Sequence, residues 1–357
     1  MLRKNRLFTP GPTPILPAAQ TAMASFAMHH RTADFRALFS RVLSDLKQFI
    51  GTNNDVLVLT ASGTGAMEGA VSNLISPGDK VLVLSAGKFG ERWRDLAKAF
   101  GCEVEVISGP YGETFSLDEI RRKLTPEIRA VYVQATESST GARHDVEGIA
   151  KVVRASGDDT LLVERAWRRM ETAKSPRYYF DFRKERKAAA KGESAFTPAT
   201  SMFAALSAAL DFVRQMGDGD MVAGREALVN NAELAAAMTR AGAQALGLKL
   251  FSPSSPSAAL TAIKAPAGVN SGAIVKEFRE SFAAVVANGQ GEMKGKLFRI
   301  AHIGYYDYLD TIGILAALEQ VLASVTATLV EYGAGVRGAQ QVYAKSITQK
   351  SQPVGAR

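Results

Sequence analysis

The chain has 357 residues, of which 46% are hydrophobic and 22% charged, with a formal net charge of +8. This length favours two domains, and the ordinary composition leaves little room for extensive disorder. The basic N-terminus has no apolar segment behind it, and no uncharged run approaches the ~18 residues of a membrane helix, so we expect neither a signal peptide nor a membrane span. The single cysteine, Cys102, excludes an internal disulfide framework and favours a cytoplasmic location.

Part of the positive charge lies between Arg165 and Lys191, in the runs RAWRR and DFRKERKAAAK. Such a stretch is consistent with a patch for nucleic acid or another anionic surface. Acidic residues are interleaved with the bases, however, and no stacking-aromatic motif or known nucleic-acid module accompanies them. We therefore predict a solvated helical face and no nucleic-acid partner.

Strands and helices alternate in the first half of the chain. Short apolar runs predict strands at residues 55–60, 80–85, 103–108, 130–136 and 160–163. Helical segments separate them, and the one at 116–124 begins with Ser116 followed by Glu119, a capping-box signature. This order predicts an α/β fold with a mostly parallel sheet and helices on both faces.

The second half has a different character. Long helices are predicted at 197–216 and 225–246. Further short elements indicate a smaller α+β domain, with strands at 259–263, 283–289 and 296–304 and helices near 271–280 and 307–327. We predict an N-terminal arm (1–17), a large domain (18–217), a small C-terminal domain (218–335) and a loose polar tail (336–357).

The strongest local motif is LTASGTGAMEGA at 59–70. A predicted strand ends in a Ser/Gly/Thr/Gly loop that opens a helix, so free backbone N–H groups and the positive helix end converge there. Ser62 and Thr64 add hydroxyl donors, which predicts an anion cradle. The loop lacks the Gly-Lys-Ser/Thr of a P-loop, and its glycine spacing argues against a dinucleotide site. The alternative is a tight turn without a ligand.

Two more loops follow strands at the same sheet edge, where open α/β sheets bind ligands. Phe89, in AGKFGERW, is suited to stacking on a flat ring, although loop phenylalanines are more often core residues. The hydroxyls of Ser138, Ser139 and Thr140 suit a polar ring substituent or a helix cap. Three convergent loops predict a site for a phosphorylated aromatic cofactor.

Arg299 lies inside the apolar strand at 296–304 and needs a partner. Its planar fork matches a carboxylate in bidentate geometry. That partner is either a structural Asp or Glu, the commoner case, or the carboxylate of a substrate. The pair His29 and His30 has neither Cys nor clustered carboxylates at ligand spacing, so we expect no metal site.

Five motifs resemble those of the class V aminotransferases, which are pyridoxal 5'-phosphate (PLP) enzymes of fold type I. In chain order they are FTPGPTPI, ASGTGAMEGAVSNLISPGDKVLVLSAGKFGERW, TESSTG, KGESAFTPA and GEMKGKLFRIAHIG. The similarity runs from about Leu7 to Tyr332 and is nearest to the alanine–glyoxylate and serine–pyruvate branch. It implies reversible amino transfer between a small amino acid, alanine or serine, and a 2-oxo acid, glyoxylate or pyruvate.

The resemblance gives roles to individual residues. Those matching the family's cofactor contacts are Thr64, Gly65, Ala66, Phe89, Ser138 and Thr197. The first three would hold the phosphate, Phe89 would stack on the pyridine ring, and Ser138 would bond near the ring oxygen. Thr197 would reach the phosphate of the neighbouring subunit, which implies a homodimer. Gly11 and Arg299 would bind the substrate's carboxylate end.

The resemblance also implies two residues that this chain lacks. Family members continue the strand ending at Val163 into an Asp that pairs with the pyridine nitrogen, and a later GSQK-like turn supplies the Schiff-base lysine. Here Val163 joins Glu164 directly. A family segment of roughly 40 residues is absent, too long to be a trimmed loop of about 2–6 residues. The central sheet is therefore expected to be incomplete.

No other lysine follows a strand in a Ser/Gly turn. The lysines considered as substitutes are Lys88, Lys174, Lys184, Lys187 and Lys191. Asp158 and Asp159 precede the strand at 160–163 and so lie at the wrong end to meet the ring. We accordingly expect no catalytic residue and no covalent attachment of PLP in the chain as written.

Three interpretations remain at this point. The printed sequence lacks a segment that a working transaminase carries, or the deletion is genuine and leaves a non-catalytic remnant that dimerises. The third is a different α/β protein, a dinucleotide-binding oxidoreductase, which the glycine spacing disfavours.

Overall fold

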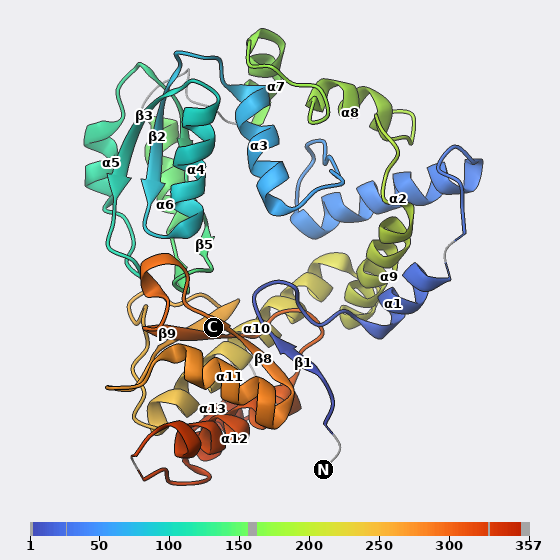
Figure 1. Ribbon diagram of the computed structural model, residues 1–357. Coiled ribbons are helices and arrows are strands. Elements are labelled where there is room, and N and C mark those ends of the chain that lie inside the picture. Colours follow the sequence, from blue (N-terminus) through green and yellow to red (C-terminus); the bar gives the residue numbers. More distant parts are fainter. Residues whose placement is uncertain (1–2, 26, 156–162, 328, 351–357) are drawn as a thin grey trace, which may run out of the picture.

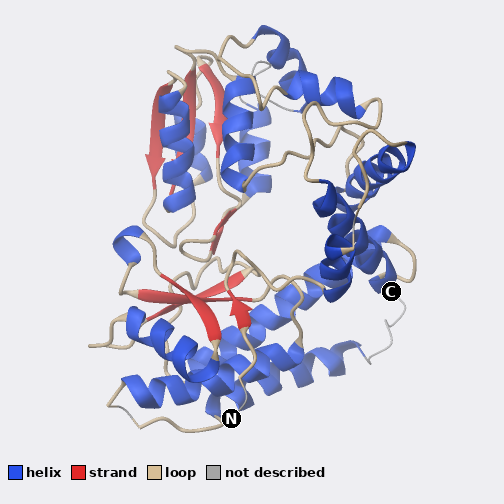
Figure 2. Ribbon diagram, turned by 45° about the vertical axis from the view of Figure 1, so that its right-hand side comes forward, coloured by secondary structure: helices blue, strands red, loops and turns tan. Residues whose placement is uncertain are grey.

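The computed structural model describes residues 3–25, 27–155, 163–327 and 329–350 (Figure 1). Two separate sheets with different surroundings organise it (Figure 2). One is a parallel sheet in the first half of the chain, and the other is a mixed sheet built largely from the second half. The α/β architecture predicted from the sequence is present.

The parallel sheet has the strand order β3-β2-β4. Its strands are β2 (Lys80–Ser85), β3 (Glu103–Ser108) and β4 (Ile128–Tyr132), all paired in parallel. The helices around it are α3 (Gly63–Leu74), α4 (Lys88–Ala99), α5 (Leu117–Lys123) and α6 (Val146–Ala155). A two-stranded hairpin, β5 (Thr136–Glu137) and β6 (Ala142–Arg143), follows β4.

The central strand β2 is covered on both faces, as its sequence VLVL requires. Successive side chains of a strand point to opposite faces. Val81 and Val83 pack with buried residues of α3 and α4, whereas Leu82 and Leu84 pack with those of α5 and α6. A strand buried on both faces needs a continuous apolar run rather than an alternating one.

Two of the predicted strands differ in the structure. Residues 55–60 form no strand, because none of the described strands pairs with them, and Val58 packs instead against a helical cluster. The strand predicted at 130–136 is β4, which begins two residues earlier and ends at Tyr132. Of the strand predicted at 160–163, residues 160–162 lie outside the described part of the chain, as do Asp158 and Asp159, and Val163 begins helix α7 (Val163–Thr172).

A helical layer lies on the far side of α3 from the parallel sheet (Figures 1 and 2). It consists of α1 (Pro17–Ala24), α2 (Ala33–Ile50) and α9 (Thr200–Met216). Phe39 of α2 stacks on Phe203 of α9, with ring centroids 4.9 Å apart. Helices α7 and α8 (Phe182–Ala189) connect the two regions along the top of Figure 1.

The part of the molecule that we call the small domain holds the mixed sheet, in the order β1-β8-β9-β7. Its strands are β1 (Arg6–Phe8), β7 (Leu260–Lys264), β8 (Ala284–Asn288) and β9 (Leu297–Ala301), and a short 3₁₀ turn, η1 (Gly291–Met293), precedes β9. The helices are α10 (Met221–Ala245), α11 (Ser271–Phe282), α12 (Tyr308–Val325) and α13 (Ala334–Lys350). The N-terminal arm is part of this domain's sheet, since β1 runs parallel to β8.

The expectation of a loose C-terminal tail is corrected in part. Residues 336–350 of the predicted loose tail belong to α13 (Ala334–Lys350), which packs on α10 and buries Ala339. Helix α12 is long and apolar enough to cross a membrane by composition alone. Its Leu315, Leu318 and Val321 are fully buried in the core of the small domain, which accounts for that apolar composition.

Candidate active site

The first turn of α3 carries the motif that predicted an anion cradle. Ser62 caps the helix with an extended backbone, and its side chain makes no capping bond. Within the described residues, the backbone N–H groups of Gly63 and Thr64 have no acceptor. The positive end of a helix macrodipole favours negative charge at such a position. The turn therefore presents two free donors to an anion.

The close packing behind this turn requires glycine at two positions. A Cβ on Gly65 would come within 2.6 Å of the Ala61 Cβ and 3.0 Å of the Phe180 ring, and one on Gly69 would come within 2.8 Å of the Phe182 ring. Asn73, fully buried on the same helix, donates to the carbonyl of Phe180 and accepts from the N–H of Phe182 at 3.0 Å. These contacts fix α3 against the segment that leads into α8.

Helix α4 brings an aromatic ring and a cation to the cradle. Phe89 lies in its first turn, and Arg92 follows one turn later. The Arg92 Nη1 donates to the Thr64 Oγ1 at 3.0 Å, and its guanidinium carbon lies 4.7 Å from the centroid of the Phe89 ring. Sequence reasoning missed Arg92, because only the packing of α4 beside α3 places its guanidinium at the cradle.

A buried carboxylate fixes the start of α4. Glu137, 1% exposed, accepts from the N–H groups of Phe89 at 3.0 Å and Gly90 at 3.1 Å through one oxygen. Its other oxygen accepts from the N–H and the hydroxyl of Ser139. A carboxylate at a helix N-terminus is stabilised by the macrodipole and the free N–H groups. The glutamate of the TESSTG motif is the feature of the sequence that could have identified this residue.

Arg299, 3% exposed on β9, completes the group. Its Nη1 donates to the Ser138 carbonyl at 2.6 Å, and Nε donates to the Asn288 carbonyl at 3.1 Å. Burial lowers the pKa of the guanidinium to about 10, although the negative charge of Glu137 acts to raise that pKa. Among the described residues it pairs with no carboxylate, so the structural Asp or Glu considered from the sequence is not its partner.

Comparison with known proteins identifies the lineage of this arrangement. Residues 9–166 match the class V aminotransferase family. An uncharacterized aminotransferase of Methanocaldococcus jannaschii is 31% identical, covering 96% of this chain and 98% of the relative. The chain belongs to the class V aminotransferases. Members of this family are PLP-dependent, which confirms the cofactor class predicted from the sequence.

Other relatives carry different names. The soluble hydrogenase 42 kDa subunit of Anabaena cylindrica is 33% identical, covering 95% of this chain and 99% of that protein. The serine–glyoxylate aminotransferase of Methylorubrum extorquens is 28% identical, covering 94% and 95%. Among solved structures, an aspartate aminotransferase of subgroup IV from Thermus thermophilus superposes with a TM-score of 0.81 at 30% identity, covering 90% of this chain and 100% of that one. The fold type I class is therefore confirmed.

In this class V aminotransferase, four of the predicted site residues lie in one connected group. Thr64 contacts Arg92, Arg92 lies over Phe89, Glu137 binds the N–H of Phe89, and Arg299 binds the carbonyl of Ser138. Gly65 and Ala66 belong to the same helical turn as Thr64. The cradle, the ring and the buried cation thus come from α3, α4 and β9, which are far apart in sequence.

The other two predicted residues, Thr197 and Gly11, make no hydrogen bond or ion pair with this group in the described part of the chain. Thr197 is exposed in the loop before α9, and two residues later the N–H of Ala199 donates to the Thr60 Oγ1 at 3.2 Å. Gly11 is exposed in a loop that Thr9 closes by donating to the Pro12 carbonyl at 2.6 Å.

The lysine nearest in sequence to Phe89 is engaged elsewhere. The Lys88 Nζ lies 2.6 Å from the Glu91 Oε2. Burial raises the pKa of Glu91, but hydrogen bonds from Lys88 and Tyr111 outweigh it and lower that pKa overall, which favours the ion pair. The other four lysines considered from the sequence are exposed: Lys174, Lys184, Lys187 and Lys191.

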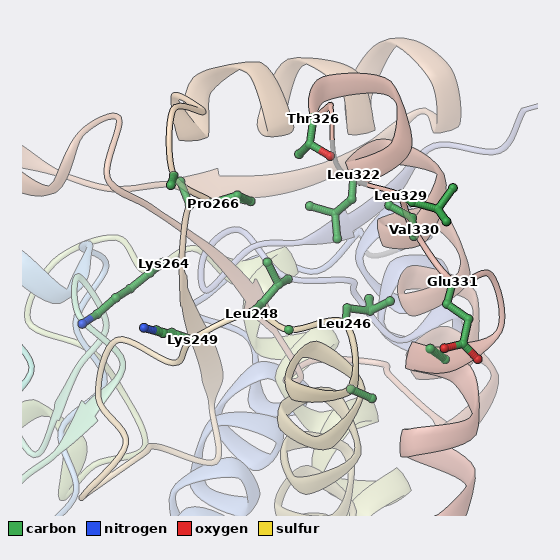
Figure 3. A pocket seen from close by; sticks show the side chains of 15 residues that line it. Leu246, Leu248, Lys249, Lys264, Pro266, Leu322, Thr326, Leu329, Val330 and Glu331 are labelled. Atoms are coloured by element: carbon green, nitrogen blue, oxygen red, sulfur yellow. The ribbon is translucent and has the colours of Figure 1, made fainter.

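A pronounced pocket lies away from this group, in the small domain (Figure 3). It has a volume of about 640 Å³ and is bounded by the ends of α10, β7 and α12. Leu246, Leu248 and Leu322 line it, and the side chains of Lys249 and Lys264 extend away from these leucines. The described residues contain no group of three potential metal ligands. The rings of His29 and His30 lie 4.5 Å apart, and the Nδ1 of His29 accepts from the N–H of Arg31 at 3.3 Å.

Proposed function

We propose that this chain is a PLP-binding member of the alanine–glyoxylate and serine–pyruvate branch, whose parent reaction is amino transfer from alanine or serine to glyoxylate or pyruvate. The carrying observation is the cradle at α3, where two free N–H groups, the Thr64 hydroxyl and the Arg92 guanidinium converge beside the Phe89 ring. This donor set fits a phosphate attached to a flat ring. The serine–glyoxylate aminotransferase among the relatives supports the substrate class.

The residues that match the family's cofactor contacts indicate how this chain would bind PLP. Thr64, Gly65 and Ala66 would form the turn that holds the PLP phosphate, with the free donors coming from the N–H groups of Gly63 and Thr64, because those of Gly65 and Ala66 donate to the Ser62 carbonyl. Phe89 would stack on the pyridine ring. When bound, PLP supplies an electron sink for the amino acid's carbanion. Ser138 would bond near the ring oxygen.

We assign Arg299 and Gly11 to the binding of the substrate's carboxylate end. Carbonyls of Ser138 and Asn288 hold the guanidinium of Arg299, which leaves N–H groups of its five donors for the substrate carboxylate. Thr197 would reach the phosphate of a second copy, so we propose a homodimer, located in the cytoplasm.

We further propose that the chain as written does not turn over, because it lacks the family segment with the cofactor-linking lysine and the aspartate that pairs with the pyridine nitrogen. Three observations support the absence of this segment. The family match ends at residue 166, close to the Val163–Glu164 junction. The alignment with the Anabaena cylindrica relative runs over 386 positions, more than the 357 residues of this chain. Residues 55–60, a typical strand sequence, pair with none of the described strands.

Without that lysine, no group at the family position takes a proton from the substrate or returns it. Lys88 is paired with Glu91, and an ion-paired ammonium is a poor base. We therefore expect no pyruvate from alanine plus glyoxylate.

The test is the intact mass of the purified protein, before and after borohydride reduction in the presence of PLP. We expect 38.1 kDa and no stoichiometric adduct. A Lys88→Arg variant is the control, since an adduct that disappears with it would come from Lys88. A mass several kDa higher, with one cofactor locked to one lysine, contradicts the proposal and means that the working protein carries the missing segment.

A further inference from the structure

Arg92 bridges the two parts of the proposed cofactor site. Its Nη1 donates to the hydroxyl oxygen of Thr64 at 3.0 Å, and its guanidinium lies over the Phe89 ring. Because Thr64 Oγ1 accepts this bond, its own hydroxyl hydrogen remains available for another acceptor. The two free N–H groups of Gly63 and Thr64 lie in the same turn.

The charge of Arg92 is not neutralised within the described part of the chain. Its neighbours on α4 are paired: Lys88 with Glu91 at 2.6 Å, and Arg94 with Asp95 at 2.8 Å. Arg92 makes no ion pair there, although its side chain is half-buried. A half-buried guanidinium beside free N–H donors matches a dianion, since it supplies a full charge where a helix end supplies about half of one.

We propose that Arg92 is a ligand of the cofactor phosphate in this chain. It donates to the phosphate through N–H groups that Thr64 does not use, and it orients the Thr64 hydroxyl to donate to the same group. This inference rests on the proposed function, because it needs PLP to bind at the α3 cradle. In this arrangement, the positive charge that meets the phosphate comes from α4 and not from the glycine loop.

The test compares equilibrium binding of PLP and of pyridoxal, which lacks the phosphate, followed by absorbance and by calorimetry. We expect Arg92→Gln to weaken PLP binding at least about tenfold, as for loss of a charge-assisted hydrogen bond, and to leave pyridoxal binding within about twofold. Arg94→Gln, on the same helix with its guanidinium on Asp95, is the matched control and leaves both constants unchanged.

The outcomes separate the two proposals. If the wild-type chain binds no PLP, the proposed function fails, and the role of Arg92 fails with it. If the wild type binds PLP and Arg92→Gln binds it equally well, only the inference is overturned. Equal weakening of PLP and pyridoxal also overturns it, since Arg92 then acts only on the structure of the site. Should Arg92→Gln not fold, Arg92→Lys replaces it: loss of the planar fork predicts several-fold weaker PLP binding with pyridoxal unchanged.

Discussion

Among single residues, buried polar groups hold in place the side chains that we assign to the ligand. Glu137 is the clearest case, because four hydrogen bonds from three residues end on its carboxylate in a place almost closed to water. The carbonyls of Ser138 and Asn288 hold Arg299 in the same way. The positions of Phe89 and Ser138 therefore follow from neighbours that carry no cofactor role.

Glu137→Ala is expected to lower the free energy of unfolding by about 3 kcal/mol, because it leaves buried N–H groups at the start of α4 without an acceptor. Urea unfolding followed by circular dichroism measures this change. The exposed Glu113→Ala is the control, and we expect it to stay within about 0.5 kcal/mol of the wild type. Equal effects of the two substitutions would show that the carboxylate contributes nothing particular at position 137.

At the scale of elements, the contact between α3 and the start of α8 connects the cradle to the residues beyond the Val163–Glu164 junction. Asn73 makes this connection, since its amide donates to the Gly69 carbonyl at 2.7 Å and also bonds the backbone of Phe180 and Phe182. Residues 180–182 pair with no strand in the described structure. The hydrogen bonds of Asn73 and the packing of the two phenylalanine rings on the glycines of α3 therefore hold them in place.

Asn73→Asp keeps the shape and the acceptor for the N–H of Phe182 but removes the amide donor to Phe180. We expect a loss of about 2 kcal/mol in unfolding free energy and faster proteolysis between Arg177 and Arg183, because a buried carbonyl loses its donor and a charge replaces an amide. Limited trypsin digestion with mass detection locates the cut. Asn53→Asp, at an exposed position, serves as the control; if its digestion pattern matches that of Asn73→Asp, the connection is unimportant.

At the scale of the whole molecule, apolar side chains remain exposed around the loop that we assign to the partner's cofactor. Met202 is 55% exposed on α9, and Tyr178, 75% exposed, lies with its ring 5.9 Å from that of Phe196, next to Thr197. A second copy covering this region would bury them, as expected for a homodimer with shared sites.

Met202→Glu is expected to shift the sedimenting species from twice 38.1 kDa toward the single chain, because it places a charge in the contact between copies. Analytical ultracentrifugation at two protein concentrations measures this change. Leu309→Glu adds the same charge at a site that is 72% exposed on α12, and it should leave the dimer intact. A monomeric wild type, or dissociation by both variants alike, would remove the basis for a dimer contact near Thr197.

The sequence alone was sufficient for the features that depend on neighbours along the chain. The apolar run of β2, the N-cap of α5 at Ser116 and the loop that opens α3 are short-range patterns, and each is present in the structure. The family motifs gave the lineage for a related reason, since they preserve local residue types in a fixed order.

Features that need a neighbour from a distant part of the chain depend on the packing of the fold. Residues 55–60 have a typical strand sequence but form no strand, because a strand needs hydrogen-bonding partners beside it. Arg299 meets backbone carbonyls instead of an acid, and Arg92 meets Thr64, because β9 packs beside the Ser138 loop and α4 beside α3. Such contacts join residues up to 161 positions apart, and no local pattern encodes them.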